Sequence, residues 1–173
     1  SMVFFAKRVQ QVVSSPTIVV LTDRNDLDGQ LYRQFAKCAD FLRQTPIQAE
    51  SRKHLGDLLR EREANGIFFT TMQKFEESEE PLSTRRNIVV VADEAHRSQY
   101  GLTEKIDSEG RVKVGAARRV RNPLPNATYI GFTGTPISQK DRSTREVFGD
   151  YIDVYDMTQA VADGAVSDFT GAA

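Results

Sequence analysis

Two adjacent carboxylates are the side chains of this sequence best suited to chemistry. Asp93 and Glu94 directly follow the apolar run Asn87–Ala92, and Ala95 and His96 come next. Such a run predicts a buried β-strand, which places both acids at its carboxyl end. There, one carboxylate can hold Mg²⁺ beside a bound triphosphate while the other orients and deprotonates the attacking water. We expect Asp93 to hold the metal and Glu94 to act on the water, with His96 in the same catalytic group.

Two further roles are compatible with the same pair. Both acids could simply cap the turn that follows the strand. Asp93, Glu94 and His96 could instead be ligands of a transition metal, but the helical H-E-x-x-H arrangement is absent and His54 falls on a separate predicted helix. The buried strand before the pair, together with a second motif downstream, favours the nucleotide interpretation.

The second motif is Thr133-Gly134-Thr135-Pro136, which follows the apolar run Ala127–Phe132. Glycine permits a close approach of the backbone to a phosphate. The two threonine hydroxyls can relay hydrogen bonds between a nucleotide and a neighbouring polymer site. Alone, the motif would be a turn; after the acidic pair, it predicts an element that couples the two sites.

Four short apolar runs must position these groups, and each is typical of a strand buried on both faces. Their hydrophobicity is continuous rather than alternating, as expected in a parallel sheet covered by helices on both sides. The runs are Thr17–Leu21, Ile67–Thr70, Asn87–Ala92 and Ala127–Phe132. Ligands of such sheets bind beyond the carboxyl ends of the strands.

Helical patterns alternate with the strands, which predicts an α/β fold. The chain opens in a helix with apolar positions from Val3 to Val13. A second helix is expected from an N-cap at Asn25 or Asp26, with Cys38 as a small core residue. A third is expected from an N-cap at Ser51 to the stop at Asn65 and Gly66.

Length and composition indicate one globular domain. With 173 residues, 39% hydrophobic and 27% charged, the chain can build one core. One cysteine and two histidines form neither an internal disulfide nor a common zinc site, which fits a reducing cytoplasm. No apolar stretch approaches the roughly 18 residues that span a bilayer. The net charge of −1 does not indicate a basic surface that binds nucleic acid. A nucleic-acid partner must therefore be argued from motifs.

Four longer stretches resemble the first motor domain of type I restriction enzyme R subunits, within the superfamily 2 helicases and translocases. The phrases TDRNDLDGQL and DEAHRSQYG are specific, whereas DEAH and TGTP also occur in Swi/Snf-like remodellers. The stretches are Val19–Phe35, Gly66–Phe75, Val89–Gly101 and Tyr129–Ile137. The resemblance implies a RecA-like, mostly parallel sheet that forms one partial motor domain over residues 1–173. Residues 147–173 would then be the connector toward a second motor domain.

By this resemblance, two sets of residues face the nucleic-acid backbone. They are Thr22, Asp23 and Arg24 in the first set, and Thr70 and Thr71 in the second. Strand-end hydroxyls, backbone N–H groups and helix N-termini can bind phosphates without a basic surface. For Arg24, an exposed ion pair is an equally good interpretation. The basic segment Gly101–Pro125 is either a surface excursion with a solvated helix or a DNA-facing insertion.

The resemblance further implies ATP and Mg²⁺ as cofactors, and double-stranded DNA with modification and specificity subunits as partners. ATP hydrolysis would drive DNA translocation before cleavage, in the cytoplasm and without a membrane. No glycine in the sequence is followed by lysine, so the phosphate loop G-x-x-x-x-G-K-[ST] is expected upstream in a parent protein. The chain alone should therefore show negligible ATPase activity. Two alternatives are another superfamily 2 helicase or remodeller, and a non-catalytic scaffold with the same fold.

Overall fold

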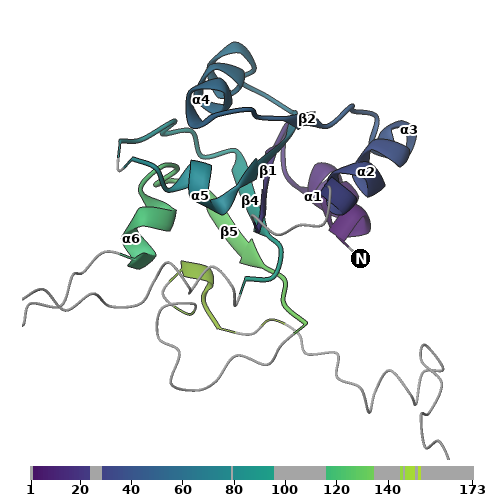
Figure 1. Ribbon diagram of the computed structural model, residues 1–173. Coiled ribbons are helices and arrows are strands. Elements are labelled where there is room, and N and C mark those ends of the chain that lie inside the picture. The colour runs from purple at the N-terminus through teal and green to yellow at the C-terminus, as the bar shows by residue number, and fades with distance from the viewer. Residues whose placement is uncertain are drawn as a thin grey trace, which may run out of the picture.

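Five parallel strands form one sheet in the order β2-β3-β1-β4-β5 in the computed structural model (Figure 1). The strands are β1 (Thr17–Thr22), β2 (Ile47–Gln48), β3 (Ile67–Thr71), β4 (Ile88–Ala92) and β5 (Thr128–Gly131). The structure describes residues 2–23, 29–78, 80–95, 116–134, 145, 147–150 and 152. The parallel sheet with helices on both faces confirms the predicted α/β fold of RecA-like type.

The central strands are buried on both faces, as predicted. Every residue of β1 and β4 is buried, and Val19 of β1 lies in register with Val90 of β4. The prediction is wrong for β5, because this strand pairs only with β4 among the described residues. Thr128 and Gly131 are consequently exposed. The two-residue strand β2 was not predicted.

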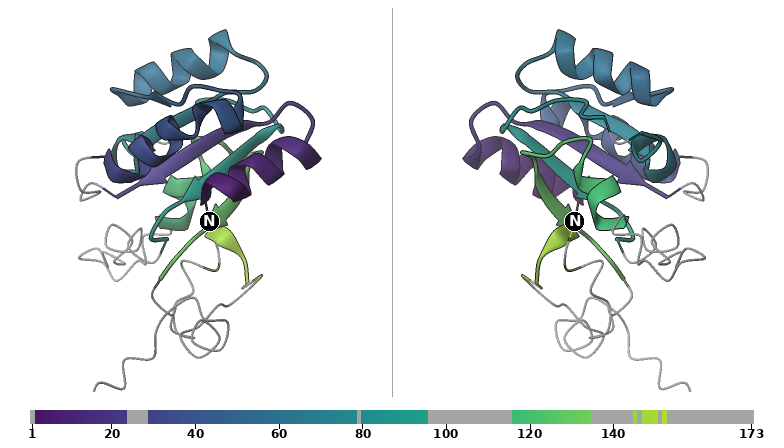
Figure 2. Two further views of the ribbon diagram at one scale, coloured as in Figure 1. Left: turned by 90° about the vertical axis from the view of Figure 1, so that its right-hand side faces the viewer. Right: turned by 90° about the vertical axis from the view of Figure 1, so that its left-hand side faces the viewer.

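Helices cover both faces, and side chains alternate between two cores along each strand. One layer holds α1 (Met2–Val12), α2 (Gln30–Lys37) and α3 (Ala39–Leu42). The other holds α4 (Arg52–Glu61), α5 (Met72–Phe75) and α6 (Ala116–Arg121). Figure 1 shows the sheet between the two layers, and the two views of Figure 2 look at the molecule from the side of each layer. Among the described residues, none of the helices combines the length and the apolarity needed to cross a bilayer.

The predicted second helix is two short helices. The chain leaves helical geometry at Cys38, whose N–H donates to the Phe35 carbonyl in a tight i to i−3 bond of 3.0 Å. Within the described residues, α2 begins at Gln30, after Gly29, whose backbone has a left-handed conformation. Asn25 and Asp26, the predicted N-caps, lie outside the described residues. Cys38 is half-buried against the core. The Ser51 N-cap is confirmed, since its hydroxyl accepts from the His54 N–H at 3.0 Å.

The helix α6 is only partly solvated. Its Val120 is fully buried, and the Tyr129 hydroxyl of β5 donates to the Val120 carbonyl at 2.8 Å. The Arg121 guanidinium lies 5.0 Å from the Tyr129 ring centroid and donates to the Val147 carbonyl at 3.1 and 2.7 Å. Arg121 is therefore engaged inside the domain. Most of the basic segment, including Arg111 and Lys113, lies outside the described residues.

One arginine ties together the amino-terminal ends of the strands. The Arg85 guanidinium donates to the Leu59 and Arg62 carbonyls at 3.1 and 2.9 Å, and to the Thr17 hydroxyl at 2.6 Å. Hydrogen bonds from a charged donor are worth about 1.5–3 kcal/mol each. The loops at this edge are thus fixed by polar contacts of their own, which leaves the opposite edge for ligands.

We predict that Arg85→Met lowers the free energy of unfolding by about 2–3 kcal/mol, because it leaves the Thr17 hydroxyl and two carbonyls without their donor. Urea denaturation of both proteins measures the difference. The exposed neighbour Arg86 is the control, and Arg86→Met should stay within about 0.5 kcal/mol of wild type. Equal losses in the two variants would contradict the assigned role of Arg85.

Candidate functional site

The two predicted acids lie at the carboxyl end of β4. The Asp93 N–H donates to the Leu21 carbonyl of β1 at 2.9 Å, and the chain then turns through Glu94 and Ala95. We call Asp93–Ala95 the acidic turn. Glu94 has a φ of 48°, a left-handed conformation that is uncommon outside glycine. Both acids are half-buried.

Asp93 does cap the turn that follows β4, as one of its alternative roles predicts. Its Oδ1 accepts a hydrogen bond from the Glu94 N–H at 3.0 Å, which supports the left-handed turn. Asp93 and Glu94 also take part in further contacts within the domain. A carboxylate oxygen has more than one lone pair, so this hydrogen bond does not prevent Asp93 from also binding a cation.

The start of the second motif lies directly beside the acidic turn. The Phe132 N–H donates to the Ala92 carbonyl at 2.8 Å, and the Ala95 N–H donates to the Phe132 carbonyl at 2.8 Å. Thr133 and Gly134 follow at once, with Thr133 half-buried and Gly134 exposed. The structure therefore brings the two motifs together. His96, Thr135 and Pro136 lie outside the described residues.

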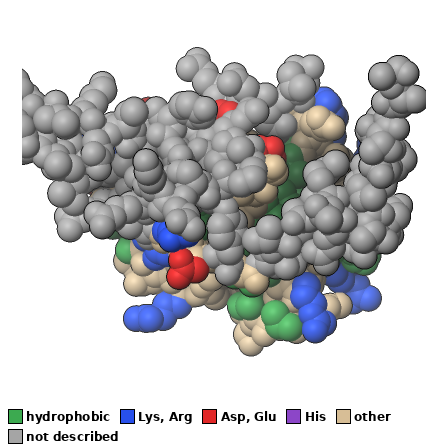
Figure 3. Space-filling model, turned by 90° about the horizontal axis from the view of Figure 1, so that it is seen from below, with side chains coloured by type: hydrophobic (Ala, Val, Ile, Leu, Met, Phe, Trp, Pro, Cys, Tyr) green, Lys and Arg blue, Asp and Glu red, His purple; other side chains and the backbone are tan. Residues whose placement is uncertain are grey.

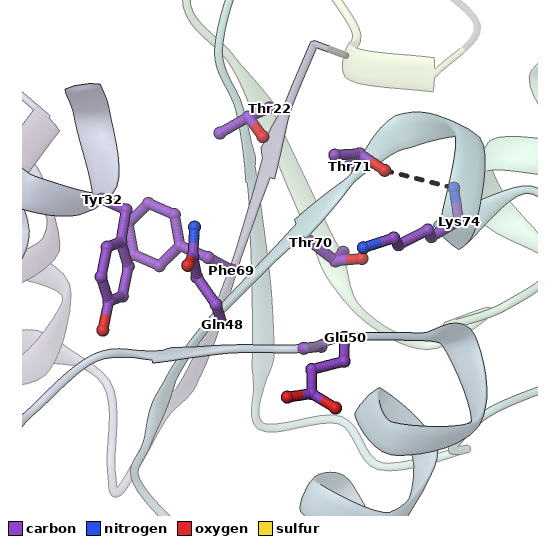
Figure 4. Close-up of a pocket in the computed structure, with 9 residues that line it drawn as sticks. Thr22, Tyr32, Gln48, Glu50, Phe69, Thr70, Thr71 and Lys74 are labelled. Atoms are coloured by element: carbon purple, nitrogen blue, oxygen red, sulfur yellow. Dashed lines mark hydrogen bonds between the residues drawn. The ribbon is translucent and has the colours of Figure 1, made fainter. Parts of the chain in front are cut away.

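A pocket of about 320 Å³ opens at the same edge of the sheet, beyond the ends of β1 and β3 (Figure 4). It brings together three residues that were expected from the sequence to face nucleic acid: Thr22, Thr70 and Thr71. Asp23 is the residue after β1 and is half-buried; it does not line the pocket. Arg24 lies outside the described residues. The remaining lining residues are Tyr32, Gln48, Ala49, Glu50, Phe69 and Lys74.

The pocket offers hydroxyl groups and one cation. The Thr70 side chain is 4% exposed, and its hydroxyl oxygen has no hydrogen-bond partner in the part of the chain that the structure describes. A buried polar group without a partner costs about 1–3 kcal/mol, so a ligand oxygen in contact with Thr70 would remove an unfavourable term. In Figure 4 the Lys74 side chain extends toward Thr70. Within the described residues, the Lys74 ammonium forms no ion pair within 4.0 Å.

Five polar or aromatic lining residues were not predicted from the sequence as site residues. Lys74 follows Thr71 by three residues, and its N–H donates to the Thr71 hydroxyl at 3.4 Å. This cap at the start of α5 was the signal that could have identified Lys74. Gln48 and Glu50 come from β2 and the residues after it, a segment too short to predict. Tyr32 reaches the pocket from α2 and packs edge-on against Phe69, with ring centroids 5.4 Å apart.

The donor set at the acidic turn suits a cation that is shared with a ligand. In the described ranges, no group of three or more His, Cys, Asp and Glu side chains could hold a metal ion. Mg²⁺ is usually held by one or two carboxylates together with substrate phosphates and water. Asp93 and Glu94, half-buried at a strand end, fit that pattern. The transition-metal alternative also needs His96, which lies outside the described residues. Acidic and basic side chains both appear on this side of the molecule (Figure 3).

Glu76 is the C-cap residue of α5 and lies two residues after Lys74 of the pocket. Burial raises the pKa of Glu76 to about 7, and the Arg119 charge opposes that shift. One carboxyl oxygen of Glu76 is buried without a hydrogen-bond partner among the described residues. This carboxyl is therefore largely protonated in the folded protein at slightly acidic pH, where an ordinary glutamate is ionised.

The chain is similar in sequence to a known family and to several known proteins. A family model described as SWI2/SNF2 ATPase matches residues 1–170. The type I restriction enzyme HindI endonuclease subunit of Haemophilus influenzae is 53% identical over 172 residues, which is 95% of this chain and 16% of that protein. The putative type I restriction enzyme MjaIXP endonuclease subunit of Methanocaldococcus jannaschii is 39% identical over 173 residues, or 96% of this chain and 15% of that protein.

A third relative is the type I restriction enzyme SsaAORF53P endonuclease subunit of Staphylococcus saprophyticus, 32% identical over 165 residues, which is 88% of this chain and 16% of that protein. The resemblance to type I restriction subunits is therefore confirmed. The chain spans about a sixth of the length of these relatives.

We predict that Glu76→Gln changes the pH dependence of stability. Because the folded pKa lies above the ordinary value of 4.5, the contribution of Glu76 is fully present below pH 4.5 and is lost as the pH rises through about 7. The variant cannot ionise at this position, so its free energy of unfolding should fall less than that of wild type between pH 5 and pH 8. Urea denaturation across this range measures it. The exposed Glu77 provides the control Glu77→Gln, and a wild-type profile in Glu76→Gln would refute the shift.

Proposed function

Because the chain belongs to the SWI2/SNF2 ATPase family, we propose that it forms part of the first motor lobe of an ATP-driven double-stranded DNA translocase. One observation carries the proposal: Phe132, the residue before the Thr-Gly-Thr-Pro motif, forms two backbone hydrogen bonds of 2.8 Å, one with Ala92 and one with Ala95 of the acidic turn. The hydroxyl pocket opens at the same edge of the sheet. A nucleotide site and a polymer site on one edge are what a motor requires.

ATP with Mg²⁺ is the proposed cofactor pair. Asp93 binds the metal, directly or through water, and Glu94 orients and deprotonates the attacking water. When bound, Mg²⁺ neutralises the charge that develops on the phosphates. Burial supports both roles, since a half-buried carboxylate interacts with charge more strongly than a fully solvated one. His96, Thr135 and Pro136 complete the proposed catalytic and coupling groups.

The pocket is the proposed contact for the DNA backbone. Thr22, Thr70 and Thr71 supply hydroxyl groups, and Lys74 adds the charge that neutralises one phosphate. Asp23 and Arg24, which follow β1, complete the proposed contact. Hydroxyl and backbone donors position a duplex without a strongly basic surface, which reconciles DNA binding with a net charge of −1.

The relatives' names suggest the wider setting. They are endonuclease subunits of type I restriction enzymes, so we propose that this chain belongs to the motor of such a subunit in the cytoplasm. Modification and specificity subunits would be its partners, and cleavage would be done elsewhere in the subunit. Residues 147–173 would lead toward the second motor lobe. Another superfamily 2 motor is the second candidate, because SWI2/SNF2 ATPase is the description of the matching family model.

We predict that Glu94→Gln in the whole protein preserves ATP binding and lowers DNA-stimulated ATP hydrolysis by at least about 10²-fold. Loss of a general base commonly has an effect of this size. Steady-state hydrolysis and equilibrium nucleotide binding measure the two properties. The exposed Glu77 gives the control Glu77→Gln, which should hydrolyse ATP normally. Unchanged hydrolysis in Glu94→Gln would remove Glu94 from its role.

We predict that Lys74→Ala weakens binding of double-stranded DNA equally for all sequences and reduces the slope of log K against log salt by about 1. One lost phosphate contact accounts for both effects. Titrations of DNA at several salt concentrations measure the slope. Lys53, exposed on α4, is the control, and Lys53→Ala should keep the wild-type slope. A wild-type slope in Lys74→Ala would place the duplex elsewhere.

A further inference from the structure

Gly131, the last residue of β5, lies where three segments meet. A Cβ atom at this position would be 2.6 Å from the Cβ of Ala95. It would also be 3.2 and 3.3 Å from two ring carbons of Phe148. Carbon atoms that are not bonded to each other prefer separations of about 3.5–4.0 Å. No side chain therefore fits at Gly131 while the acidic turn stays in place.

The contact with Ala95 cannot be relieved by rotating a side chain. The Ala95 methyl is attached directly to the backbone, so any relief must move the backbone of the acidic turn or that of β5. The two backbones are joined beside the contact, because the Ala95 N–H donates to the Phe132 carbonyl and the Phe132 N–H donates to the Ala92 carbonyl. An added methyl group would thus displace the residue next to Glu94.

Phe148 closes the other side of the same space. Its ring packs against the core cluster that contains Ala95. Val147, the preceding residue, is buried, and its carbonyl accepts two hydrogen bonds from the Arg121 guanidinium at 3.1 and 2.7 Å. Figure 1 shows this segment beside the end of β5. An added methyl group would therefore be too close to Ala95 on one side and to the Phe148 ring on the other.

The requirement for glycine is steric, and it does not come from the backbone conformation. The glycines with positive φ are Gly29, Gly66 and Gly149 within the described residues, so Gly131 has a conformation that alanine also adopts. Gly134 of the Thr-Gly-Thr-Pro motif differs as well, because a Cβ there would meet nothing within 4 Å. In this region, the glycine that leaves no room for a side chain is therefore Gly131 and not the motif glycine Gly134.

We propose that Gly131 is a positioning residue, which places the Glu94 carboxylate by allowing Ala95 to pack against β5. In this role Gly131 acts through Ala95 and not through contact with the reacting groups. The inference rests on the proposed function, in which Glu94 acts on the attacking water. The left-handed backbone of Glu94 is held by its surroundings, so a shift at Ala95 passes directly to the neighbouring residue. A misplacement of about 1 Å can lower a reaction rate by about 10²-fold.

The test introduces Gly131→Ala into the whole protein, alone and combined with Ala95→Gly. We expect Gly131→Ala to lower kcat of DNA-stimulated ATP hydrolysis by at least about tenfold, with KM for ATP changed by less than about threefold. The second substitution removes the methyl that the new Cβ would meet. The double variant should therefore recover kcat to within about threefold of the Ala95→Gly single variant. Thr128→Val, at an exposed position of the same strand, should leave kcat unchanged.

Two results would overturn the inference. One is a wild-type kcat in Gly131→Ala. The other is a Gly131→Ala variant that folds and loses kcat, when adding Ala95→Gly does not restore kcat. If Gly131→Ala fails to fold, the double variant decides: recovery of both folding and turnover supports the inference, and failure to recover them overturns it. Glu94→Gln is measured in parallel. Normal hydrolysis in Glu94→Gln would refute the proposed function, whereas a silent Gly131→Ala beside an inactive Glu94→Gln would refute only the role of Gly131.

Discussion

Two backbone hydrogen bonds between Phe132, the residue after β5, and the residues on either side of the acidic pair hold the candidate site together. They join Ala95 and Ala92 to Phe132, each at 2.8 Å, and they continue the parallel pairing of β4 with β5 beyond the strand ends. Each motif would otherwise be a turn at the end of a separate strand. Because all strands run in one direction, both turns fall on one edge, and the bonds make them one structural unit.

The central strand β1 connects the two halves of this edge. Its Leu21 carbonyl accepts the Asp93 N–H at 2.9 Å, and the next residue, Thr22, lines the pocket. The two halves are therefore linked by one hydrogen bond and one peptide bond. At the opposite edge, Arg85 fixes the loops through bonds to Thr17 and to carbonyls near α4. The buried polar side chains of β1 and β3 lie at or next to the strand ends, so polar function is confined to the two edges.

The sequence predicted the parts of the fold that continuous apolar runs define. The strands β1, β3 and β4, the Ser51 cap and the place of the acidic pair all follow from local patterns. It did not predict β2, because two residues form no pattern, or the break at Cys38, which divides an otherwise regular apolar stripe. The position of β5 as an outermost strand of the sheet depends on how the strands pair, and no local sequence pattern indicates that pairing.

The candidate site likewise contains residues that could be predicted from the sequence and residues whose positions depend on tertiary packing. The family resemblance implied that Thr22, Thr70 and Thr71 face the nucleic-acid backbone, and the structure places all three around one pocket. Lys74, Gln48 and Glu50 enter the pocket from elements whose positions depend on tertiary packing. The tight contact of Gly131 with Ala95 joins residues 36 positions apart in the printed numbering. Only the folded chain reveals that a methyl group has no room there.

The strand order has a consequence for how the chain acquires this structure. β1 lies in the middle of the sheet, yet both of its partners, β3 and β4, come much later in the sequence. During synthesis from the N-terminus, β1 therefore leaves the ribosome long before its neighbours and stays without a partner strand until they emerge. Sheets built from such distant pairings fold slowly and expose apolar strand edges on the way. The most deeply buried strand of the finished domain is thus the one that waits longest for its partner strands while the domain is being made.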